Sequence, residues 1–389
     1  MIISKNHVIF RGIHDMLTVN ESFAVLEVLM INSHYIPRLI LKKFSDDKEH
    51  LIYADLIHQK CEIRRLESVF SKKGYYSDDL EHDLSKSIES KFAQLLNDNL
   101  LKSKDQIILS REELFLLKKF LLIGSLRKSF PRDEIETRNG SAVDEFVYER
   151  NKKFFESRMD EILKCNTSEE LLKFCDTKCE EMIDNGLLRA IKRIVYGYMS
   201  FVSTETCGEN LIISDCACGY WYGEEPFAKL DLIFNSKSPY AICLLDKIDP
   251  ADYVYFPISK HLGVLAISPI FRKEYGIFDV KKYSKSGLEK RLGFDDKHLL
   301  NAPSVTFLGA GGRTPNKYVY TKTQLSLKNA IFFNILTMQT SYKFIAFSNY
   351  EKVKSSIESY IKNQGMKHDL SFIAVNAKIN MSVFAKLKK

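Results

Sequence analysis

The chain has 389 residues, of which 45% are hydrophobic and 28% are charged, enough apolar material for one large or two ordinary domains that fold without disulfide support. Its apolar runs are broken by charge, as Lys118 and Lys119 break the run 115–126, which argues against a membrane-spanning helix and for a soluble protein. A formal net charge of +7 permits a polyanionic partner such as nucleic acid but does not require one.

The N-terminus begins with a weakly patterned extension over residues 1–33. Met30 lies four residues before His34 within this region. Two interpretations stay open: Met30 is the natural start of the chain, or the apolar residues between 23 and 29 form a strand packed on the core. Mass spectrometry of the native protein would decide between them.

The first informative stretch is Asn32-Ser33-His34-Tyr35-Ile36-Pro37-Arg38, followed by the apolar and basic segment 39–44. Because a residue before proline is held extended, we expect His34 and Tyr35 at a strand end or tight connection, and Pro37 at the first position of a helix. An imidazole held in such a corner can act as acid, base or ligand near neutral pH. His34 is therefore the first candidate site residue.

A hairpin and a helix are expected next. The runs 51–55 and 61–66 have the composition of two short strands around a turn. Apolar residues at helical spacing then predict a helix over 83–101, whose start Asp78 or Asp79 can cap.

The middle of the chain also has helical patterns. Ser110 and Glu113 have the spacing of a capping box and open the apolar run 114–126, which Pro131 ends. Three further helices are predicted by apolar spacing, over 142–165, 168–183 and 187–202.

From about Thr204 the pattern changes to short apolar or alternating runs separated by Gly, Pro, Asn and Ser. These runs are 211–213, 230–234, 241–245, 253–256 and 263–267. They predict a mostly antiparallel sheet. Helical spacing returns over 322–337, and 343–347 has the pattern of a closing strand.

The predicted fold class is α+β, with a helical N-terminal and middle region and a mostly antiparallel sheet in the C-terminal half. No internal repeat or low-complexity tract interrupts it. The expected organisation is an extension over 1–33, a single α+β domain over 34–348 with a hairpin and helices over 34–203 and a sheet-rich part over 204–348, and a C-terminal helix and tail over 349–389.

The candidate chemistry centres on His34 and Asp215. Ser214-Asp215 follows a buried strand, where a carboxylate can orient the imidazole or help hold a metal. Arg38 can hold a phosphate, and Asn334 can donate to an oxyanion, a set that suits phosphodiester cleavage. The structural alternative is that Asp215 forms a turn and Asn334 is a buried hydrogen-bonding residue.

Other candidates carry weaker signals. The cysteines lack a zinc spacing or a neighbouring histidine, so zinc is not favoured. The segment 309–314 is glycine-rich but lacks the ending of a phosphate loop, so a flexible loop is the simpler interpretation. Trp221 between two tyrosines has the composition of a stacking platform for bases or of an ordinary core cluster.

Four short motifs in order carry a family resemblance. They are His34-Tyr35-Ile36-Pro37-Arg38 with Leu41 and Phe44, Ile212-Ile213-Ser214-Asp215, Tyr255-Phe256-Pro257-Ile258-Ser259, and Phe333-Asn334. With them, the chain from His34 to about Ser348 resembles the bacterial domain of unknown function 4238 family. The chain departs from that pattern at Arg38, where glutamine is usual, and at Cys216-Ala217, where Asn-Pro is usual. The resemblance implies a place in anti-phage defence and no particular reaction.

Two functions from different classes stay open. The first is an anti-phage effector with toxin character, a nuclease cleaving RNA or DNA with His34 and Asp215 at its centre and Arg38 and Asn334 in support. A divalent metal is an open question for that site. The second is a non-catalytic sensor or binding module that recognises a phage component. Eight cysteines without a disulfide spacing or a preceding secretory signal indicate reduced thiols and a cytoplasmic protein.

Overall fold

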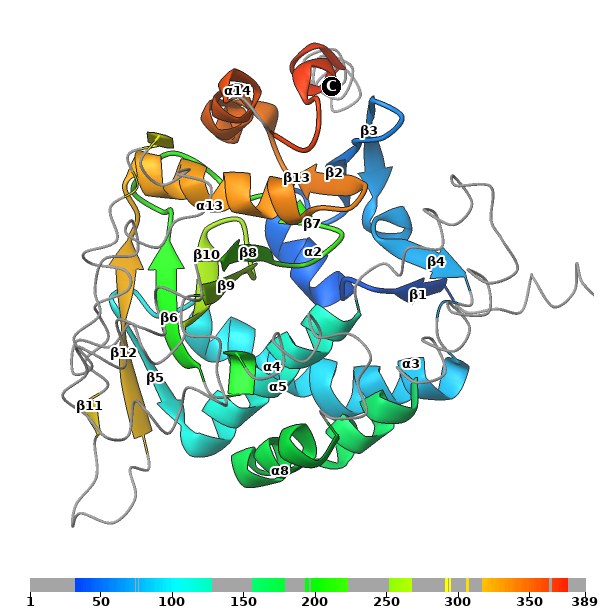
Figure 1. Cartoon of the computed structure of the whole chain (residues 1–389), viewed down its shortest axis with the longest axis vertical. Coiled ribbons are helices and arrows are strands. Elements are labelled where there is room, and N and C mark those ends of the chain that lie inside the picture. The colour runs from blue at the N-terminus through cyan, green and yellow to red at the C-terminus, as the bar shows by residue number, and fades with distance from the viewer. Residues whose placement is uncertain are drawn as a thin grey trace, which may run out of the picture.

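The computed structural model describes residues 32–73, 75, 77–127, 156–178, 193–195, 197–222, 252–267, 291–292, 294, 306–307, 317–363 and 366–376. Within these residues helices and three sheets combine into an α+β fold, as the sequence predicts (Figure 1). Among the strands that the structure describes, all pairs are antiparallel except one between β6 and β12 (Tyr198–Ser203 and Lys317–Gln324). In the described part of the chain, no helix is both long enough and apolar enough to cross a membrane.

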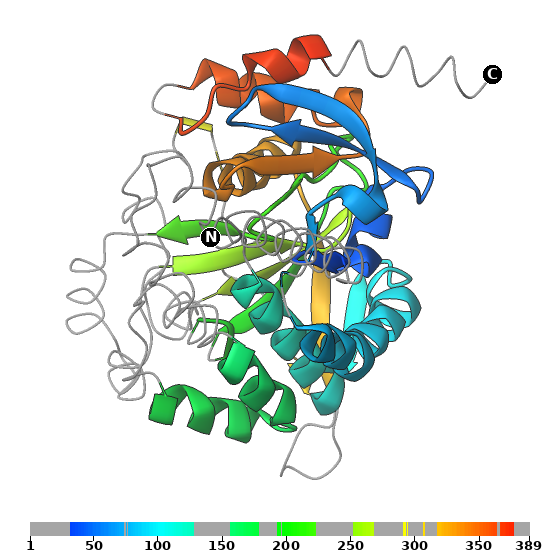
Figure 2. The same ribbon diagram turned by 90° about the vertical axis from the view of Figure 1, so that its right-hand side faces the viewer.

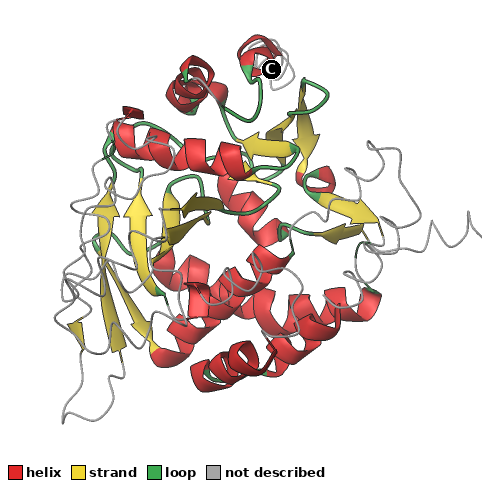
Figure 3. Ribbon diagram, in the orientation of Figure 1, coloured by secondary structure: helices red, strands yellow, loops and turns green. Residues whose placement is uncertain are grey.

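The largest sheet lies at the left in Figure 3, with α13 above it. Its strand order is β11-β12-β6-β10-β9-β8, and β5 also pairs with β12. The bounds of the strands not yet given are β11 Thr306–Phe307, β10 Leu262–Ile267, β9 Asp252–Pro257, β8 Gly219–Tyr222 and β5 Gln106–Ser110. Strand β9 packs on α13 (Leu327–Thr340) through Tyr255 and Phe333, whose rings stack at 4.6 Å.

The smaller sheet has the order β3-β2-β13-β7. Its strands are β3 Lys60–Arg65, β2 His50–Asp55, β13 Phe344–Phe347 and β7 Ile213–Ser214. The predicted hairpin is confirmed as β2 and β3, and the predicted closing strand as β13. Figure 2 shows this sheet and α14 (Lys354–Lys362) above the large sheet, with the helices of the first half of the chain below.

One long helical segment forms the wall on which the site is built. It runs through α3 (Asp78–Leu84), a π-helical turn η2 (Ser85–Glu89), α4 (Ser90–Leu95) and a second π-helical turn η3 (Leu96–Leu100). Leu84, Ile88 and Phe92 on its apolar face are buried, which confirms the helix predicted from their spacing. The N-cap is Ser77, which accepts the Leu80 amide, rather than Asp78 or Asp79, because those aspartates already lie in the first helical turn.

Helix α5 (Arg111–Leu126) packs beside this segment, and Phe92 stacks on Phe120 of α5. The capping box is confirmed: the Glu113 amide donates to Ser110 Oγ at 3.1 Å, and the Ser110 amide donates to the Glu113 carboxylate at 2.7 Å. The backbone amides of Ser110 and Glu113 thus each have a hydrogen-bond acceptor. The helix ends at Leu126, so Arg127 follows it directly.

Two predicted helices differ from the structure. The helix over 187–202 is wrong at its C-terminal end, because Tyr198–Ser203 is the central strand β6. The helix over 322–337 begins too early: Lys317–Gln324 is β12, and the helix starts after the N-cap Ser326. Both strands gain ladder hydrogen bonds from neighbours distant in sequence, which local apolar spacing cannot reveal.

Several predictions lie outside the described residues and receive no outcome. They are the strand over 23–29, the Met30 start, Pro131, the strands over 230–234 and 241–245, the glycine-rich segment 309–314 and parts of the helices over 142–165 and 168–183. Within those two segments, residues 156–164 and α8 (Ser168–Lys178) are helical.

Candidate functional site

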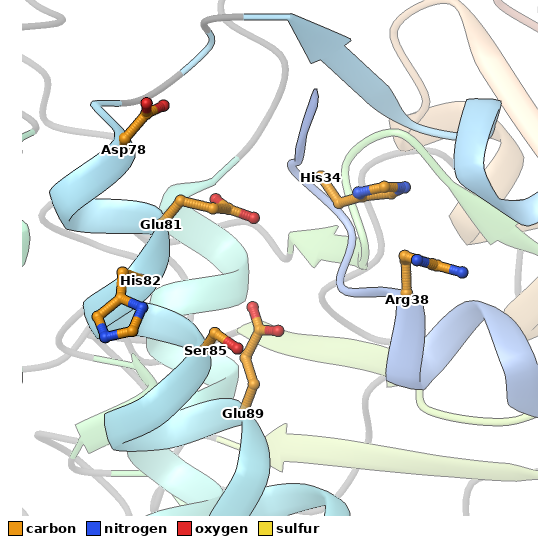
Figure 4. A pocket seen from close by; sticks show the side chains of 7 residues that line it. All are labelled: His34, Arg38, Asp78, Glu81, His82, Ser85 and Glu89. Atoms are coloured by element: carbon orange, nitrogen blue, oxygen red, sulfur yellow. The ribbon is translucent and has the colours of Figure 1, made fainter. Parts of the chain in front are cut away.

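A pocket of about 350 Å³ opens between the corner that carries His34 and the polar face of the long helical segment. Its lining residues are His34, Arg38, Asp78, Glu81, His82, Ser85 and Glu89. Figure 4 shows two walls, with His34 and Arg38 on one side and the helical residues on the other. In the figure, the carboxylate of Glu81 points from the helix toward the first wall, and that of Glu89 points along the helix toward Ser85 and Glu81.

The first wall is set by backbone geometry around Pro37. His34 ends the short strand β1 (Asn32–His34), which pairs with β4 (Ser71–Lys73), so the predicted strand end is confirmed. Pro37 is the N-cap of α2 (Arg38–Phe44), one residue before the position predicted for it, with φ −55° and ψ 135°. Arg38 thus takes the first helical position and stands close to His34 at the pocket.

His34 is held in one tautomer by its surroundings. Its Nε2 lies 3.3 Å from the carbonyl oxygen of Leu66. Because a carbonyl can only accept, Nε2 carries the proton in the neutral ring, and Nδ1 is left as an acceptor. Burial lowers the pKa of His34 below its ordinary value, and the charges of Arg38 and Arg127 act in the same direction. The ring is therefore neutral at pH 7.

The second wall is one stripe of the helix, since Asp78, Glu81, Ser85 and Glu89 recur at three- and four-residue spacing. Ser85 and Glu89 are the first and last residues of the π-helical turn η2. Such turns occur often at functional sites because they shift side chains relative to a regular α-helix.

Arg127 forms ion pairs with both glutamates of this wall, Glu81 and Glu89. Its side chain is 1% exposed, and its guanidinium donates to Glu89 at 2.5 Å and to Glu81 at 3.3 Å. Burial raises the pKa of Glu81, and repulsion by Glu89 adds to this, whereas the Arg127 charge and the His34 backbone amide oppose it. The pKa of His34 is thus lowered and that of Glu81 is raised, so that the two are displaced toward one another.

Arg38 provides an accessible cation at the pocket. Its side chain is 46% exposed and forms an ion pair with Glu67, which is 56% exposed. Exposed ion pairs contribute little stability, so an anionic ligand can take the place of Glu67 at small cost.

Asp215 lies elsewhere and is fully buried. Its carboxylate accepts the backbone amides of Tyr342 at 2.8 Å, Lys343 at 2.7 Å and Phe344 at 3.0 Å. Burial raises its pKa to about 6, against the opposing effect of these amides. The residue binds the turn that leads from α13 into β13, which is the structural role that the sequence left open.

Asn334 is likewise buried and occupied by structural bonds. Its Oδ1 accepts the Ile212 amide at 2.9 Å, and its Nδ2 donates to the Asn210 carbonyl at 2.8 Å and to Ser356 Oγ at 2.9 Å. Of the four predicted site residues, the structure brings His34 and Arg38 to one pocket. Asp215 and Asn334 are not among the residues that line it.

A family comparison covers both regions. The model of a family described as a protein of unknown function (DUF4238) matches residues 32–351. The chain belongs to this family. No curated protein and no solved structure matches the chain.

The segment matched to DUF4238 begins at β1 and includes every pocket residue. Sequence reasoning did not identify three charged residues in or beside the pocket: Glu81, Glu89 and Arg127. The spacing of Glu81, Ser85 and Glu89 opposite the buried face of a predicted helix was the available signal. No local signal identifies Arg127, because its partners lie 38 and 46 residues earlier in the chain.

The other candidates from the sequence that lie among the described residues of the DUF4238 segment have structural roles. Trp221 is 3% exposed and stacks on Tyr253 at 5.2 Å, so it belongs to the core and does not offer an open platform. Cys216 and Cys218 are buried, and each thiol faces a backbone carbonyl. Among the described residues, no group of three or more His, Cys, Asp or Glu is placed to hold a metal ion.

Proposed function

We propose that this protein cleaves phosphodiester bonds of nucleic acid by acid–base catalysis in the His34 pocket. The observation that carries the proposal is the meeting of His34, Arg38 and Glu81 at one pocket. These residues combine a neutral imidazole, an accessible guanidinium and a carboxyl group. Phosphodiester cleavage needs a proton acceptor for the nucleophile, a cation for the phosphate and a proton donor for the leaving oxygen.

Each residue has a role that its surroundings favour. His34 accepts the proton of the nucleophile at Nδ1, because Nε2 faces the Leu66 carbonyl. Glu81 donates to the leaving oxygen, since burial raises its pKa and so extends the pH range in which it is protonated. Arg38 binds the phosphate in place of Glu67, in the bidentate geometry that guanidinium groups favour.

The biological setting of the proposal is bacterial defence against phage. It rests on the motif resemblance, which implies a place in anti-phage defence, whereas the nucleic-acid target is inferred from the residues of the pocket. A cytoplasmic place of action accompanies it, because the cysteine pattern favours reduced thiols.

The test compares wild-type protein with His34→Ala and Glu81→Gln. Purified proteins are incubated with end-labelled RNA and DNA, and matched cultures are followed for growth and nucleic-acid integrity. We expect wild type to cleave, and each variant to lose activity by about 10²–10⁴-fold. His58→Ala is the matched control, because His58 is 55% exposed and paired with Asp55 at the hairpin turn. Equal cleavage by wild type and Glu81→Gln, or no cleavage by folded wild type, contradicts the proposal.

A second candidate is favoured by the acidic wall. Asp78, Glu81 and Glu89 place carboxylates on one side of the pocket, a surface suited to a cationic segment of a phage component. The protein would then be a sensor without catalysis. Binding of such a component that is abolished by Glu89→Gln, without nucleic-acid cleavage by wild type, would favour this function.

A further inference from the structure

We propose that the substrate is RNA and that its own 2′-hydroxyl is the nucleophile, so that cleavage yields a 2′,3′-cyclic phosphate and a 5′-hydroxyl. This inference rests on the proposed phosphodiester cleavage and names its substrate class. It follows from three of the groups that line the two walls of the pocket: His34 as the base, Glu81 as the acid and Arg38 as the cation.

The base side of the reaction is His34. Because Nε2 donates to the Leu66 carbonyl, Nδ1 is the nitrogen of the neutral ring that can accept a proton. In RNA the 2′-hydroxyl is adjacent to the scissile phosphorus, so the substrate positions its own nucleophile. In DNA that hydroxyl is missing, and cleavage needs a separately bound and oriented water. The described pocket residues therefore complete the catalytic set for RNA more directly than for DNA.

The acid side is the helical wall. Glu81 is held by Arg127, which also holds Glu89, so its carboxyl group stays directed across the pocket toward the His34 wall. Two carboxylates sharing one guanidinium keep an excess of negative charge, which favours a proton on one of them. Glu81 is the residue whose surroundings favour that proton.

The step balances without a further reactant. His34 Nδ1 takes the proton of the 2′-hydroxyl, O2′ forms a bond to phosphorus, and the bond from phosphorus to O5′ breaks. The Glu81 carboxyl gives its proton to O5′, and Arg38 offsets the charge on the non-bridging oxygens. The protein ends with a protonated His34 and an ionised Glu81, and proton exchange with water restores both.

The approach to the pocket is suited to a polyanion. Strand β4 pairs with β1 in a register that sets Ser71 opposite His34, and the next two residues, Lys72 and Lys73, are exposed. The pKa of Glu67 is lowered first by the backbone amide of Glu67 and then by the charges of Arg38 and Arg65, so both arginines lie near this carboxylate. A strand of RNA can therefore follow a basic edge that leads to His34.

The experiment uses the full chain and three oligonucleotides of one sequence: all-DNA, DNA with a single central ribonucleotide, and the same with a 2′-O-methyl group there. Reactions contain EDTA. We expect cleavage only of the oligonucleotide with the free 2′-hydroxyl, immediately 3′ of that position, with a cyclic phosphate identified by mass spectrometry. Cleavage of all three, or 5′-phosphate ends, overturns the RNA inference and leaves the nuclease proposal standing. Failure to cleave any nucleic acid overturns both.

A second substrate separates the chemical role of Glu81 from a structural one. Replacing the 5′ oxygen of the leaving group by sulfur removes the need for a proton donor, because a thiolate leaves readily. We expect Glu81→Gln to cleave this substrate within about tenfold of the wild-type rate, while it remains about 10²-fold slower or worse on the oxygen substrate. Equal loss on both substrates overturns the role of Glu81 as proton donor. Glu62→Gln, at an exposed position of β3, is the control.

Discussion

The His34 pocket and the buried centre around Asp215 both contain ionisable side chains, but the partners of these side chains differ between the two regions. Each oxygen of Asp215 accepts backbone amides, and both polar atoms of the Asn334 side chain form bonds to residues of the fold. At the pocket, His34, Glu81 and Glu89 are placed where a ligand can reach them. Residue type alone therefore does not separate a site from a structural centre, whereas the partners do.

Both regions lie within the segment matched to DUF4238. Asp215 and Asn334 join segments that are far apart in the chain, namely the strands of the small sheet and helix α13. Helix α2, whose N-cap is Pro37, lies below the small sheet in Figure 1, so the corner that carries His34 adjoins this framework. Variants in the two regions should therefore fail in different ways.

The largest effect is expected from Asp215→Ala. Each buried amide left without an acceptor costs about 1–3 kcal/mol, so the loss of three acceptor contacts should lower the free energy of unfolding by about 3 kcal/mol or more. Urea denaturation followed by circular dichroism measures it. Asp55→Ala is the matched control, because Asp55 binds two amides in an exposed turn that water can solvate. Similar small losses in both variants would contradict the structural assignment of Asp215.

The pH dependence of stability gives a second test of the same centre. The folded-state pKa of Asp215 is raised to about 6, so the folded protein binds a proton there that the unfolded chain releases near pH 4. Stability from this group is present below about pH 4 and is lost as pH rises to about 6, a change of about 3 kcal/mol. The difference in unfolding free energy between wild type and Asp215→Asn, measured from pH 4 to 7, should show this fall. A difference that stays constant with pH contradicts it.

At the pocket, Arg127→Met should change titration more than fold. Arg127 lowers the pKa of both His34 and Glu81, so both pKa values should rise when its charge is removed. NMR titration of the His34 ring and the Glu81 carboxyl carbon measures this without any assay of cleavage. Cleavage should fall by about 10- to 100-fold through misplaced carboxylates.

Arg127→Lys keeps the charge and should retain most of both pKa values, which separates charge from shape. Arg64→Met is the control, because Arg64 pairs with the exposed Glu62 on β3 and neither residue lines the pocket. Unchanged titration of His34 and Glu81 in a folded Arg127→Met protein would show that Arg127 does not set the proton affinity of the pocket.

The same contrast shows what local sequence can and cannot reveal. The turn at Pro37 and the capping box at Ser110 depend on neighbouring residues, and both were predicted within one residue. Strand β6 was predicted as helix, because it is buried throughout most of its length and therefore lacks the alternation of a half-buried strand.

For the candidate site the limit is the same. His34 and Arg38 are four residues apart and were predicted together. The wall of the pocket that faces these two residues comes from a helix about 50 residues later in the chain, and Arg127 comes from the end of another helix. Asp215 is the residue type of a catalytic partner, and only tertiary structure shows that the amides of 342–344 occupy it.

A smaller effect is expected from Lys72→Glu combined with Lys73→Glu. If β4 guides RNA to His34, the double variant should bind single-stranded RNA about tenfold more weakly. The slope of the logarithm of the binding constant against the logarithm of salt concentration should become less steep by about 0.7 for each phosphate contact removed. Fluorescence anisotropy at several salt concentrations measures both quantities. Lys352→Glu with Lys362→Glu, exposed positions near and on α14, is the matched control. Equal weakening in both pairs would point to general charge and not to a track at β4.

The smallest effect is a gain, expected from Gly124→Ala in α5. A Cβ at Gly124 meets nothing within 4 Å, and the residue borders an apolar cavity of about 30 Å³ beside Pro37 and Ile213. Alanine should stabilise the helix interior by about 0.5–1 kcal/mol, since it lowers the entropy of the unfolded chain. Thermal unfolding measures the gain. Arg127 lies one turn or less after Gly124, directly past the end of α5. An unchanged cleavage rate in this variant would show that the stability of α5 does not limit the pocket, whereas a change in rate would show that the two are coupled through α5.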